Sequence, residues 1–209
     1  MYKRQTYSRT LKSTDVHTAV LENDYIKAVF LPDFGGRLWS LTDKTTGENL
    51  LYTNDVIRFS NLSTRNAWFS GGVEWNMGII GHSPLSNDSL FTASGTTDSG
   101  VPFLRMYEYE RIREAEYQMD FWLEEKSRSL NCRMRIVNHT DQVIPMYWWS
   151  NMAVPEYPSG QIIVPAATAY TCKNWEVYKV NAPEVDGNNI FHYESIPDQI
   201  DYFFDIPYE

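Results

Sequence analysis

The sequence predicts an all-β protein built from large antiparallel sheets. Apolar and polar residues alternate in several runs, Asn, Asp, Gly and Pro bound these runs, and aromatic residues make up 15% of the 209 residues. Alternation with period two indicates strands that have one polar face, and aromatic residues favour sheets. The only helical candidate is 111–119, and its neighbours favour strand. We therefore expect residues 1–209 to form a single β-sandwich domain.

The first strands are predicted at 18–23 and 25–31, with Asn23-Asp24 between them. The turn Pro-Asp-Phe-Gly-Gly then leads into a strand over 37–43. A second turn, at 45–48, precedes a further strand over 49–53. β-rich runs that are separated by such turn residues are typical of antiparallel hairpins.

Longer strands are predicted at 101–112, 116–125 and 129–138. In the first of these, Arg105 and Tyr107 share one face, which is either a polar concave surface or a solvated one. The pattern does not choose between these two interpretations.

The segment 143–155 is nearly all apolar, which predicts a strand that is buried on both faces. Trp148 and Trp149 must point to opposite faces of this strand, so one of them belongs to the core and the other is available to a ligand. Asn151 shares a face with Trp149. The pattern is weaker after residue 165, and we expect the aromatic tail over 201–209 to pack against another surface.

The composition excludes several classes of partner. The net charge is −9, from 18 basic and 27 acidic residues, and no run of Lys or Arg is present, so we expect no nucleic-acid partner. No stretch approaches 18 apolar residues and the N-terminus lacks an apolar signal core, so we expect no membrane span and a cytoplasmic protein. The histidines outside residues 66–84 have no metal-ligand spacing, and we expect neither a metal nor a cofactor.

Residues 66–84, NAWFSGGVEWNMGIIGHSP, concentrate the residue types that bind sugars. Trp68 and Trp75 are candidates to stack on a sugar ring, because flat apolar rings suit the C–H faces of sugars. Asn76 is a further candidate for substrate binding. We expect this loop to form one wall of a carbohydrate groove.

Glu74 and His82 are the candidate catalytic residues of this loop. A carboxylate between indoles is partly desolvated, which suits a general acid. Glu74 could equally bind a ligand without chemistry, or fix the loop by accepting backbone hydrogen bonds. His82 could shuttle a proton, donate to a sugar oxygen, or only hold the loop.

Three further candidates for substrate binding lie outside this loop. Trp149 and Asn151 would face the ligand from the later strand. Arg37 follows the Gly35-Gly36 turn, and its alternative interpretation is a surface or sheet-edge arginine.

Several of these motifs resemble known families. AVFLPDFGGRLWSLTDKTTGENLLY, at 28–52, resembles the opening of the galactose mutarotase-like superfamily. FSGGVEWN, at 69–76, and MYWWSNMAVP, at 146–155, resemble an uncharacterised bacterial domain that is often found ahead of tetratricopeptide repeats. The resemblance covers roughly residues 15 to 170. It implies a β-supersandwich with a concave sheet face that holds a sugar, and a complete domain longer than this chain.

The chain departs from aldose mutarotases at their catalytic positions. Ser70 stands where those enzymes have a histidine, and Trp148, Trp149 and Asn151 occupy the region of their second histidine. Their glutamate base lies near the end of the domain, which we expect to fall beyond residue 209. The resemblance therefore implies a sugar-binding fold and does not carry over mutarotase chemistry.

Two functions remain open at this point. The first is a carbohydrate-binding domain. If it is an enzyme, it would be a glycoside hydrolase or resemble an aldose epimerase, and Glu74 would need a second group. The alternatives for that group are Asp88, Glu156, Glu176 or a residue outside this chain. The second is a non-catalytic interaction or structural module of a larger protein, which would dock other parts of its own chain or a protein partner, or form a homo-oligomer.

Overall fold

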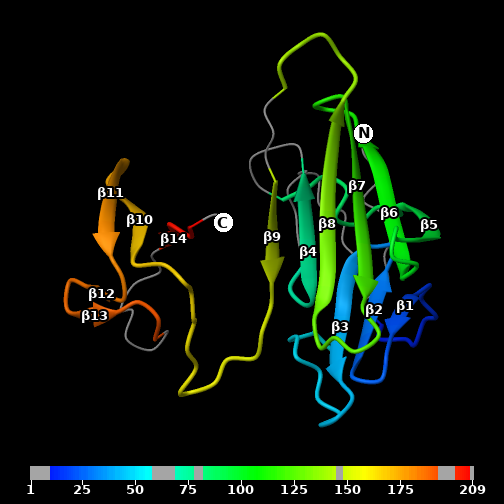
Figure 1. The fold of residues 1–209 in the computed structure, drawn as a ribbon, viewed down its shortest axis with the longest axis horizontal. Coiled ribbons are helices and arrows are strands. Elements are labelled where there is room, and N and C mark those ends of the chain that lie inside the picture. Colours follow the sequence, from blue (N-terminus) through cyan, green and yellow to red (C-terminus); the bar gives the residue numbers. More distant parts are fainter. Residues whose placement is uncertain (1–9, 58–68, 78–81, 145–147, 193–200, 208–209) are drawn as a thin grey trace. The chain divides into compact units, whose positions relative to one another are not determined.

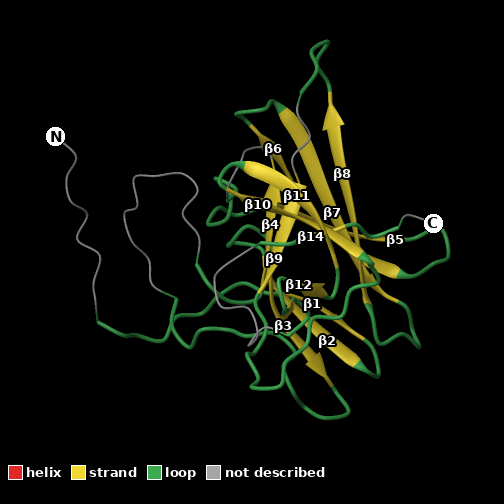
Figure 2. Cartoon of the chain, turned by 90° about the vertical axis from the view of Figure 1, so that its left-hand side faces the viewer, coloured by secondary structure: helices red, strands yellow, loops and turns green. Residues whose placement is uncertain are grey.

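The computed structural model describes residues 10–57, 69–77, 82–144, 148–192 and 201–207. Every regular element among these residues is a β-strand, and Figure 2 shows strands and loops only. The described part of the chain thus holds no helix that could span a membrane. The prediction of an all-β protein with antiparallel sheets is confirmed. The chain divides into two compact units, Met1–Pro155 and Glu156–Glu209.

The first unit contains two antiparallel sheets (Figure 1). The five-stranded sheet has the order β1-β2-β3-β4-β9, and the four-stranded sheet has the order β5-β6-β7-β8. The strands are β1 (Ala19–Glu22), β2 (Ile26–Leu31), β3 (Arg37–Asp43), β4 (Val73–Met77), β5 (Phe91–Thr96), β6 (Pro102–Glu110), β7 (Ala115–Leu123), β8 (Leu130–Asn138) and β9 (Trp148–Met152).

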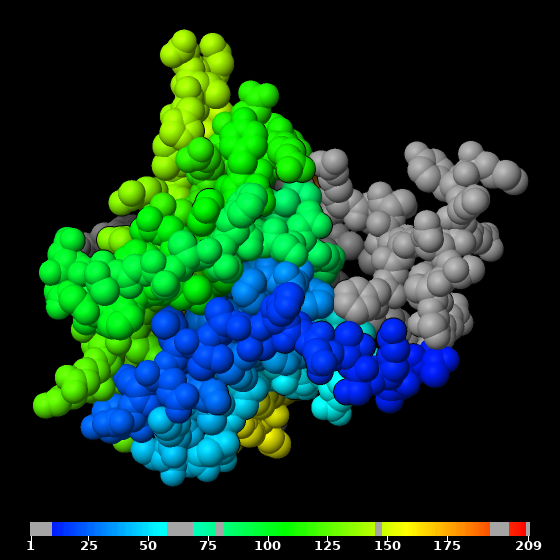
Figure 3. All heavy atoms as spheres, turned by 90° about the vertical axis from the view of Figure 1, so that its right-hand side faces the viewer, coloured from blue at the N-terminus to red at the C-terminus, as the bar shows by residue number. Residues whose placement is uncertain are grey.

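The two sheets of this unit share one apolar core. Phe30 of β2 and Phe121 of β7 are both 0% exposed, and their ring centroids lie 4.7 Å apart. Leu38, Val73 and Met119 belong to the same buried cluster. The inner faces of the two sheets therefore pack together as a sandwich. Figure 3 shows the N-terminal residues, in blue, packed beside the residues in green, and β1 contacts β6.

Most of the strands agree with the sequence pattern. The predicted runs 101–112, 116–125 and 129–138 correspond to β6, β7 and β8. The helical candidate 111–119 is instead a turn followed by β7. Here the Glu110 carboxylate accepts hydrogen bonds from the backbone N–H groups of Ile112 and Arg113, at 2.9 and 2.6 Å, so two backbone donors of the turn are satisfied.

Three predictions about strands were wrong. Residues 73–77 form β4, although we expected a loop throughout 66–84, and residues 49–53 form only isolated bridges. The 143–155 strand is shorter than expected and is not buried on both faces, since β9 covers only Trp148–Met152 and its residues are half-buried or exposed. The physical reason is that β9 pairs with β4 alone and ends the described sheet.

The second unit is small. A three-stranded sheet has the order β11-β10-β14, and β12 pairs with β13. These strands are β10 (Thr168–Lys173), β11 (Glu176–Asn181), β12 (Glu184–Val185), β13 (Asn188–Asn189) and β14 (Phe203–Phe204). The aromatic tail lies partly against this unit, because Phe204 packs on Phe191 with ring centroids 5.7 Å apart, whereas Phe203 is 67% exposed.

Candidate functional site

A polar cluster lies on the face of the five-stranded sheet that points away from the sandwich core. Along β4, Val73 and Met77 enter the core, whereas Glu74 and Asn76 alternate to the other face. The antiparallel register with β9 places Asn151 opposite Glu74 and Trp149 opposite Asn76. We call Arg37, Glu74, Asn76, His82, Trp149 and Asn151 the Glu74 cluster.

The centre of the cluster is a buried pair of opposite charges. Arg37 and Glu74 are each 3% exposed, and Nη2 of Arg37 lies 3.6 Å from Oε1 of Glu74. The Arg37 guanidinium also donates from Nη1 to the Gly71 carbonyl at 2.8 Å and lies 3.8 Å from the centroid of the Phe69 ring. Burial lowers the pKa of Arg37 to about 10, although the Glu74 charge opposes this shift, so Arg37 stays protonated at neutral pH.

His82 and Asn151 complete the coordination of the Glu74 carboxylate. His82 Nδ1 lies 2.8 Å from Oε2 of Glu74, and Asn151 donates from Nδ2 to the same oxygen at 3.4 Å. The imidazole centroid lies 5.0 Å from the Trp149 ring. A carboxylate at Nδ1 favours the tautomer that carries its proton there, which orients Nε2 as an acceptor in neutral histidine. The His82 side chain is 16% exposed, so it is more accessible than the buried Glu74 behind it.

Asn76 fixes the chain segment that carries His82. Its side chain is 0% exposed, and Oδ1 accepts the backbone N–H of Ser83 at 2.6 Å. The position of the imidazole therefore depends on β4 through two contacts, one from Glu74 and one from Asn76.

Several buried polar atoms in the cluster make no hydrogen bond to the protein. These are Nε and Nη2 of Arg37, Oε1 of Glu74 and Nδ2 of Asn76. Nη2 of Arg37 and Oε1 of Glu74 still face each other as an ion pair at 3.6 Å, so the atoms with neither a hydrogen bond nor an ion pair are Nε of Arg37 and Nδ2 of Asn76. An unpaired buried polar atom costs on the order of 1–3 kcal/mol, and such groups concentrate at functional sites.

The glycine pair beside the cluster allows the close approach of two strands. Gly72 has φ +67°, and a Cβ added there would lie 2.2 Å from the Leu38 carbonyl oxygen. Gly71 has φ +120°, and a Cβ added there would contact the Trp39 ring. Trp39 is the extra residue of a β-bulge in β3. Only glycine suits such positions, so the pairing of β4 with β3 depends on these two glycines.

The structure brings together most, but not all, of the predicted site residues. Arg37, Glu74, Asn76, His82, Trp149 and Asn151 lie together. Trp75 instead faces the core, where its ring lies 5.2 Å from that of Phe121 and Nε1 donates to the Gly36 carbonyl at 3.0 Å. Trp148 stacks on Trp75 and packs on the core, as alternation with Trp149 requires. Trp68 lies outside the described residues.

Sequence reasoning missed Phe69 and understated Arg37. The pairing of Arg37 with the distant Glu74 leaves no local pattern in the sequence. Phe69 could have been found, because it is an aromatic residue close to the Gly71-Gly72 pair. The other histidines contact residues outside the Glu74 cluster. Within the described ranges, no group of three His, Cys, Asp or Glu side chains is arranged to hold a metal ion.

The fold and this cluster together define the protein as an antiparallel β-sandwich with a charged, aromatic-flanked site on one sheet. The chain belongs to the family "Domain of unknown function (DUF5107)", whose model matches residues 2–197.

Two solved structures share the fold. A TPR-domain containing protein from Parabacteroides distasonis ATCC 8503 is 27% identical with a TM-score of 0.78, and the match covers 90% of this chain and 32% of that one. The Slr1438 protein from Synechocystis sp. PCC 6803 is 16% identical with a TM-score of 0.61, and the match covers 87% of this chain and 68% of that one. The chain thus spans about a third of the Parabacteroides protein.

Proposed function

We propose that this domain binds a carbohydrate at the Glu74 cluster. The observation that carries the proposal is the Glu74 carboxylate, which holds both His82 and Asn151 beside the Trp149 ring on one sheet face. Ligand sites combine apolar rings with a few convergent polar groups, and sugars use both kinds of contact.

The geometry supports a different task for each residue. Glu74 is almost fully buried, so it orients its neighbours and sets the charge of the site. His82 and Asn151 offer donors and acceptors that suit sugar hydroxyls, and Trp149 offers a flat face. In this arrangement His82 is the candidate proton carrier, which transfers to the imidazole the acid–base role that the sequence suggested for Glu74.

Two further observations support a sugar ligand. Nε of Arg37 and Nδ2 of Asn76 are buried without a hydrogen bond to the described residues, and such buried polar atoms are uncommon outside functional sites. The resemblance of residues 28–52 to the galactose mutarotase-like superfamily implies a sheet face that holds a sugar.

The test is a titration of the purified chain with a panel of neutral monosaccharides and oligosaccharides, followed by calorimetry and saturation-transfer NMR. We expect saturable binding of at least one sugar in the millimolar range or tighter. His82→Gln should weaken it roughly tenfold, the effect of one lost hydrogen bond. His139→Gln is the matched control, since His139 is exposed on β8's following turn and pairs with Glu116. Equal affinities in the two variants, or no binding across the panel, would exclude the proposal.

One observation favours a second candidate, a docking module. The Parabacteroides protein, of which this chain matches 32%, is named for its TPR domain. Such helical repeats form extended binding surfaces, so a β-sandwich in the same polypeptide could serve assembly. This candidate predicts that no sugar binds and that the Glu74 cluster contributes to stability alone.

A further inference from the structure

The outer face of the four-stranded sheet, which points away from the sandwich core, carries aromatic and basic side chains. Met106 and Met119 are 0% exposed on the core face, so the alternate residues of β6 and β7 point outward. The register of the four strands aligns one outward-pointing residue from each strand in a row, which we call the Tyr107 row: Phe91, Tyr107, Gln118 and Arg135. A ligand on this face would therefore meet aromatic rings at one end of the row and a cation at the other.

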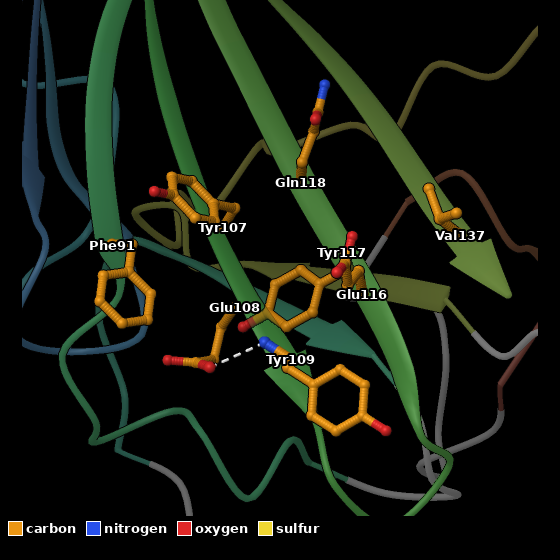
Figure 4. A pocket seen from close by; sticks show the side chains of 8 residues that line it. All are labelled: Phe91, Tyr107, Glu108, Tyr109, Glu116, Tyr117, Gln118 and Val137. Atoms are coloured by element: carbon orange, nitrogen blue, oxygen red, sulfur yellow. Dashed lines mark hydrogen bonds between the residues drawn. The ribbon is translucent and has the colours of Figure 1, made fainter. Parts of the chain in front are cut away.

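A hollow of about 190 Å³ opens on this face beside the Tyr107 row (Figure 4). Figure 4 shows one lining residue on each of the four strands: Phe91, Tyr107, Gln118 and Val137. The Phe91 and Tyr107 rings stack with centroids 5.5 Å apart, and they are 60% and 42% exposed. Glu108 and Tyr117 also border the hollow, but alternation along β6 and β7 assigns them to the core face. The volume is below the roughly 300–1,000 Å³ of pockets that enclose drug-sized ligands, so the hollow suits a single small ring.

Arg135 provides an unpaired positive charge beside the hollow. It is the direct cross-strand neighbour of Gln118, it is exposed, and its guanidinium makes no ion pair within the part of the chain that the structure describes. In the next row, Arg105 and Arg133 share the single carboxylate of Asp120, so that row keeps one net positive charge. The net charge of the whole chain is −9, so this face is a local exception that favours an anionic ligand.

Glu116 is the other carboxylate on the outer face of these strands. It lies one row beyond the Tyr107 row, and its Oε2 lies 3.1 Å from Nε2 of His139. On the other side, Arg133 is 53% exposed and contacts Asp120 through Nη2. The anion of a ligand is therefore best placed between Arg133 and Arg135, on the side of the row that faces away from Glu116.

Uncharged polar groups complete the surroundings of the hollow. Gln118 donates from Nε2 to Oδ2 of Asp120 at 3.3 Å, which leaves its Oε1 available as an acceptor. Tyr107 and Tyr109 are exposed, and their hydroxyl groups can both donate and accept. Such groups suit the hydroxyls of a sugar, whereas an aromatic carboxylate would use only the rings and the arginine.

The spacing of the strands matches the size of a sugar ring. β6 and β8 flank β7, and adjacent strands lie about 4.8 Å apart, so Tyr107 and Arg135 are separated by about 10 Å across Gln118. A pyranose that is stacked on Tyr107 would reach Arg135 with a carboxylate at its edge. We propose that this outer face binds an acidic saccharide, whose uronate ring stacks on Tyr107 and whose carboxylate pairs with Arg135. The site lies on a different sheet from the Glu74 cluster and does not depend on it.

The test compares methyl β-D-glucuronide with methyl β-D-glucoside, which has a neutral hydroxymethyl group in place of the carboxylate. NMR titration of the full chain follows the amide signals of β6, β7 and β8. We expect the glucuronide to bind saturably and at least about threefold more tightly than the glucoside, because an exposed arginine–carboxylate pair accounts for a factor of that size. Equal affinities, or no saturable shifts with the glucuronide up to about 100 mM, would overturn the proposal. Tighter binding of benzoate than of the glucuronide would assign the face to aromatic carboxylates and also contradict it.

Two variants separate the roles of the arginine and the ring. Arg135→Gln removes the charge and should reduce the ratio of the two affinities to about one. Tyr107→Leu keeps an apolar side chain but removes the ring, so it should weaken both probes roughly fivefold and leave their ratio unchanged. Arg128→Gln is the matched control, since Arg128 lies between β7 and β8 and contacts Asp43. Thermal melts verify that each variant is folded, and an unchanged ratio in Arg135→Gln would contradict the proposal.

His82→Gln distinguishes this site from the sugar site proposed on the other sheet. It should leave the glucuronide affinity unchanged, because His82 belongs to the Glu74 cluster. Loss of glucuronide binding in His82→Gln, together with normal binding in Arg135→Gln, would place the acidic sugar at the Glu74 cluster and overturn the proposal.

Discussion

Glu74 is held by side chains from three separate segments of the chain. Arg37 comes from β3, His82 from the segment after β4, and Asn151 from β9. A buried ion pair of this kind adds little net stability by itself, yet removal of one partner leaves an uncompensated charge. The residue is therefore sensitive to substitution whether or not it takes part in chemistry.

Glu74→Gln is expected to lower the free energy of unfolding by about 3 kcal/mol, because Arg37 would keep a buried charge without its partner. The same change should weaken sugar binding by about 1–3 kcal/mol through His82 and Asn151. Urea denaturation and calorimetric titration measure the two effects. Glu48→Gln, at an exposed position, is the control. Full stability in Glu74→Gln would show that the Arg37–Glu74 pair does not stabilise this face of the sheet. Sugar turnover that is abolished by this change would assign Glu74 to catalysis.

Gly72→Ala should cost more than 3 kcal/mol of unfolding free energy. The new Cβ would lie only 2.2 Å from the Leu38 carbonyl oxygen, and alanine would also be strained by the positive φ of this position. Gly47→Ala is the matched control, since Gly47 has φ +79° and open space around its Cβ position, so only about 1–2 kcal/mol of backbone strain is expected. Equal chemical denaturation midpoints for the two variants would contradict the close packing of β3 and β4.

At the scale of elements, the central strands of the four-stranded sheet are joined by an ionic ladder. Arg105 on β6, Asp120 on β7 and Arg133 on β8 are direct cross-strand neighbours. Asp120 is 1% exposed and accepts hydrogen bonds from both arginines, at 2.6–2.8 Å. Burial by itself raises the pKa of Asp120, but the hydrogen bonds from Arg105 and Arg133 outweigh it and hold the pKa below its usual value.

This ladder predicts a pH-dependent contribution to stability. Because the folded pKa of Asp120 is depressed, its contribution is fully present above the unfolded value of about 3.9 and is lost as the pH falls through the folded pKa. Asp120→Asn should therefore be less stable than the parent by about 2 kcal/mol at pH 7, and the difference should shrink below about pH 4. Thermal melts between pH 2.5 and 7 measure it, with Asp24→Asn as an exposed control. A difference that is constant with pH would exclude ionisation of Asp120 as the source.

At the scale of the whole molecule, stability is distributed unevenly. Met119 and Phe121 of β7 are 0% exposed, and β7 has a hydrogen-bonded partner on both sides. The segment 156–163 lies between β9 and β10, contains no strand and is mostly exposed.

Hydrogen exchange followed by mass spectrometry should show this contrast. Peptides from β6 and β7 should exchange last, because they open only when the unit unfolds, whereas peptides from 156–163 should exchange within seconds. Peptides from β2, which lies inside the other sheet of the same core, serve as an internal reference. Equal protection of β7 and 156–163 would contradict the assigned core.

Much of the fold could be predicted from sequence. The strands β6, β7 and β8 were predicted within two residues because long runs with period two are the strongest strand signal. The strand β4 was missed since its alternation covers only five residues between glycines. The strand β5, with the sequence FTASGT, was missed because it is short of apolar residues and exposed along most of its length.

The sequence by itself determined the all-β class, the long antiparallel strands and the residue types of the site. These features are local, because alternation, turn residues and composition act over a few neighbouring positions. The tertiary structure alone decided that Trp75 faces the core while Glu74 faces away from it, and that Arg37 pairs with Glu74. The physical reason is that alternation assigns side chains to two faces, but the packing of one sheet on another decides which face is buried and which distant residues meet there.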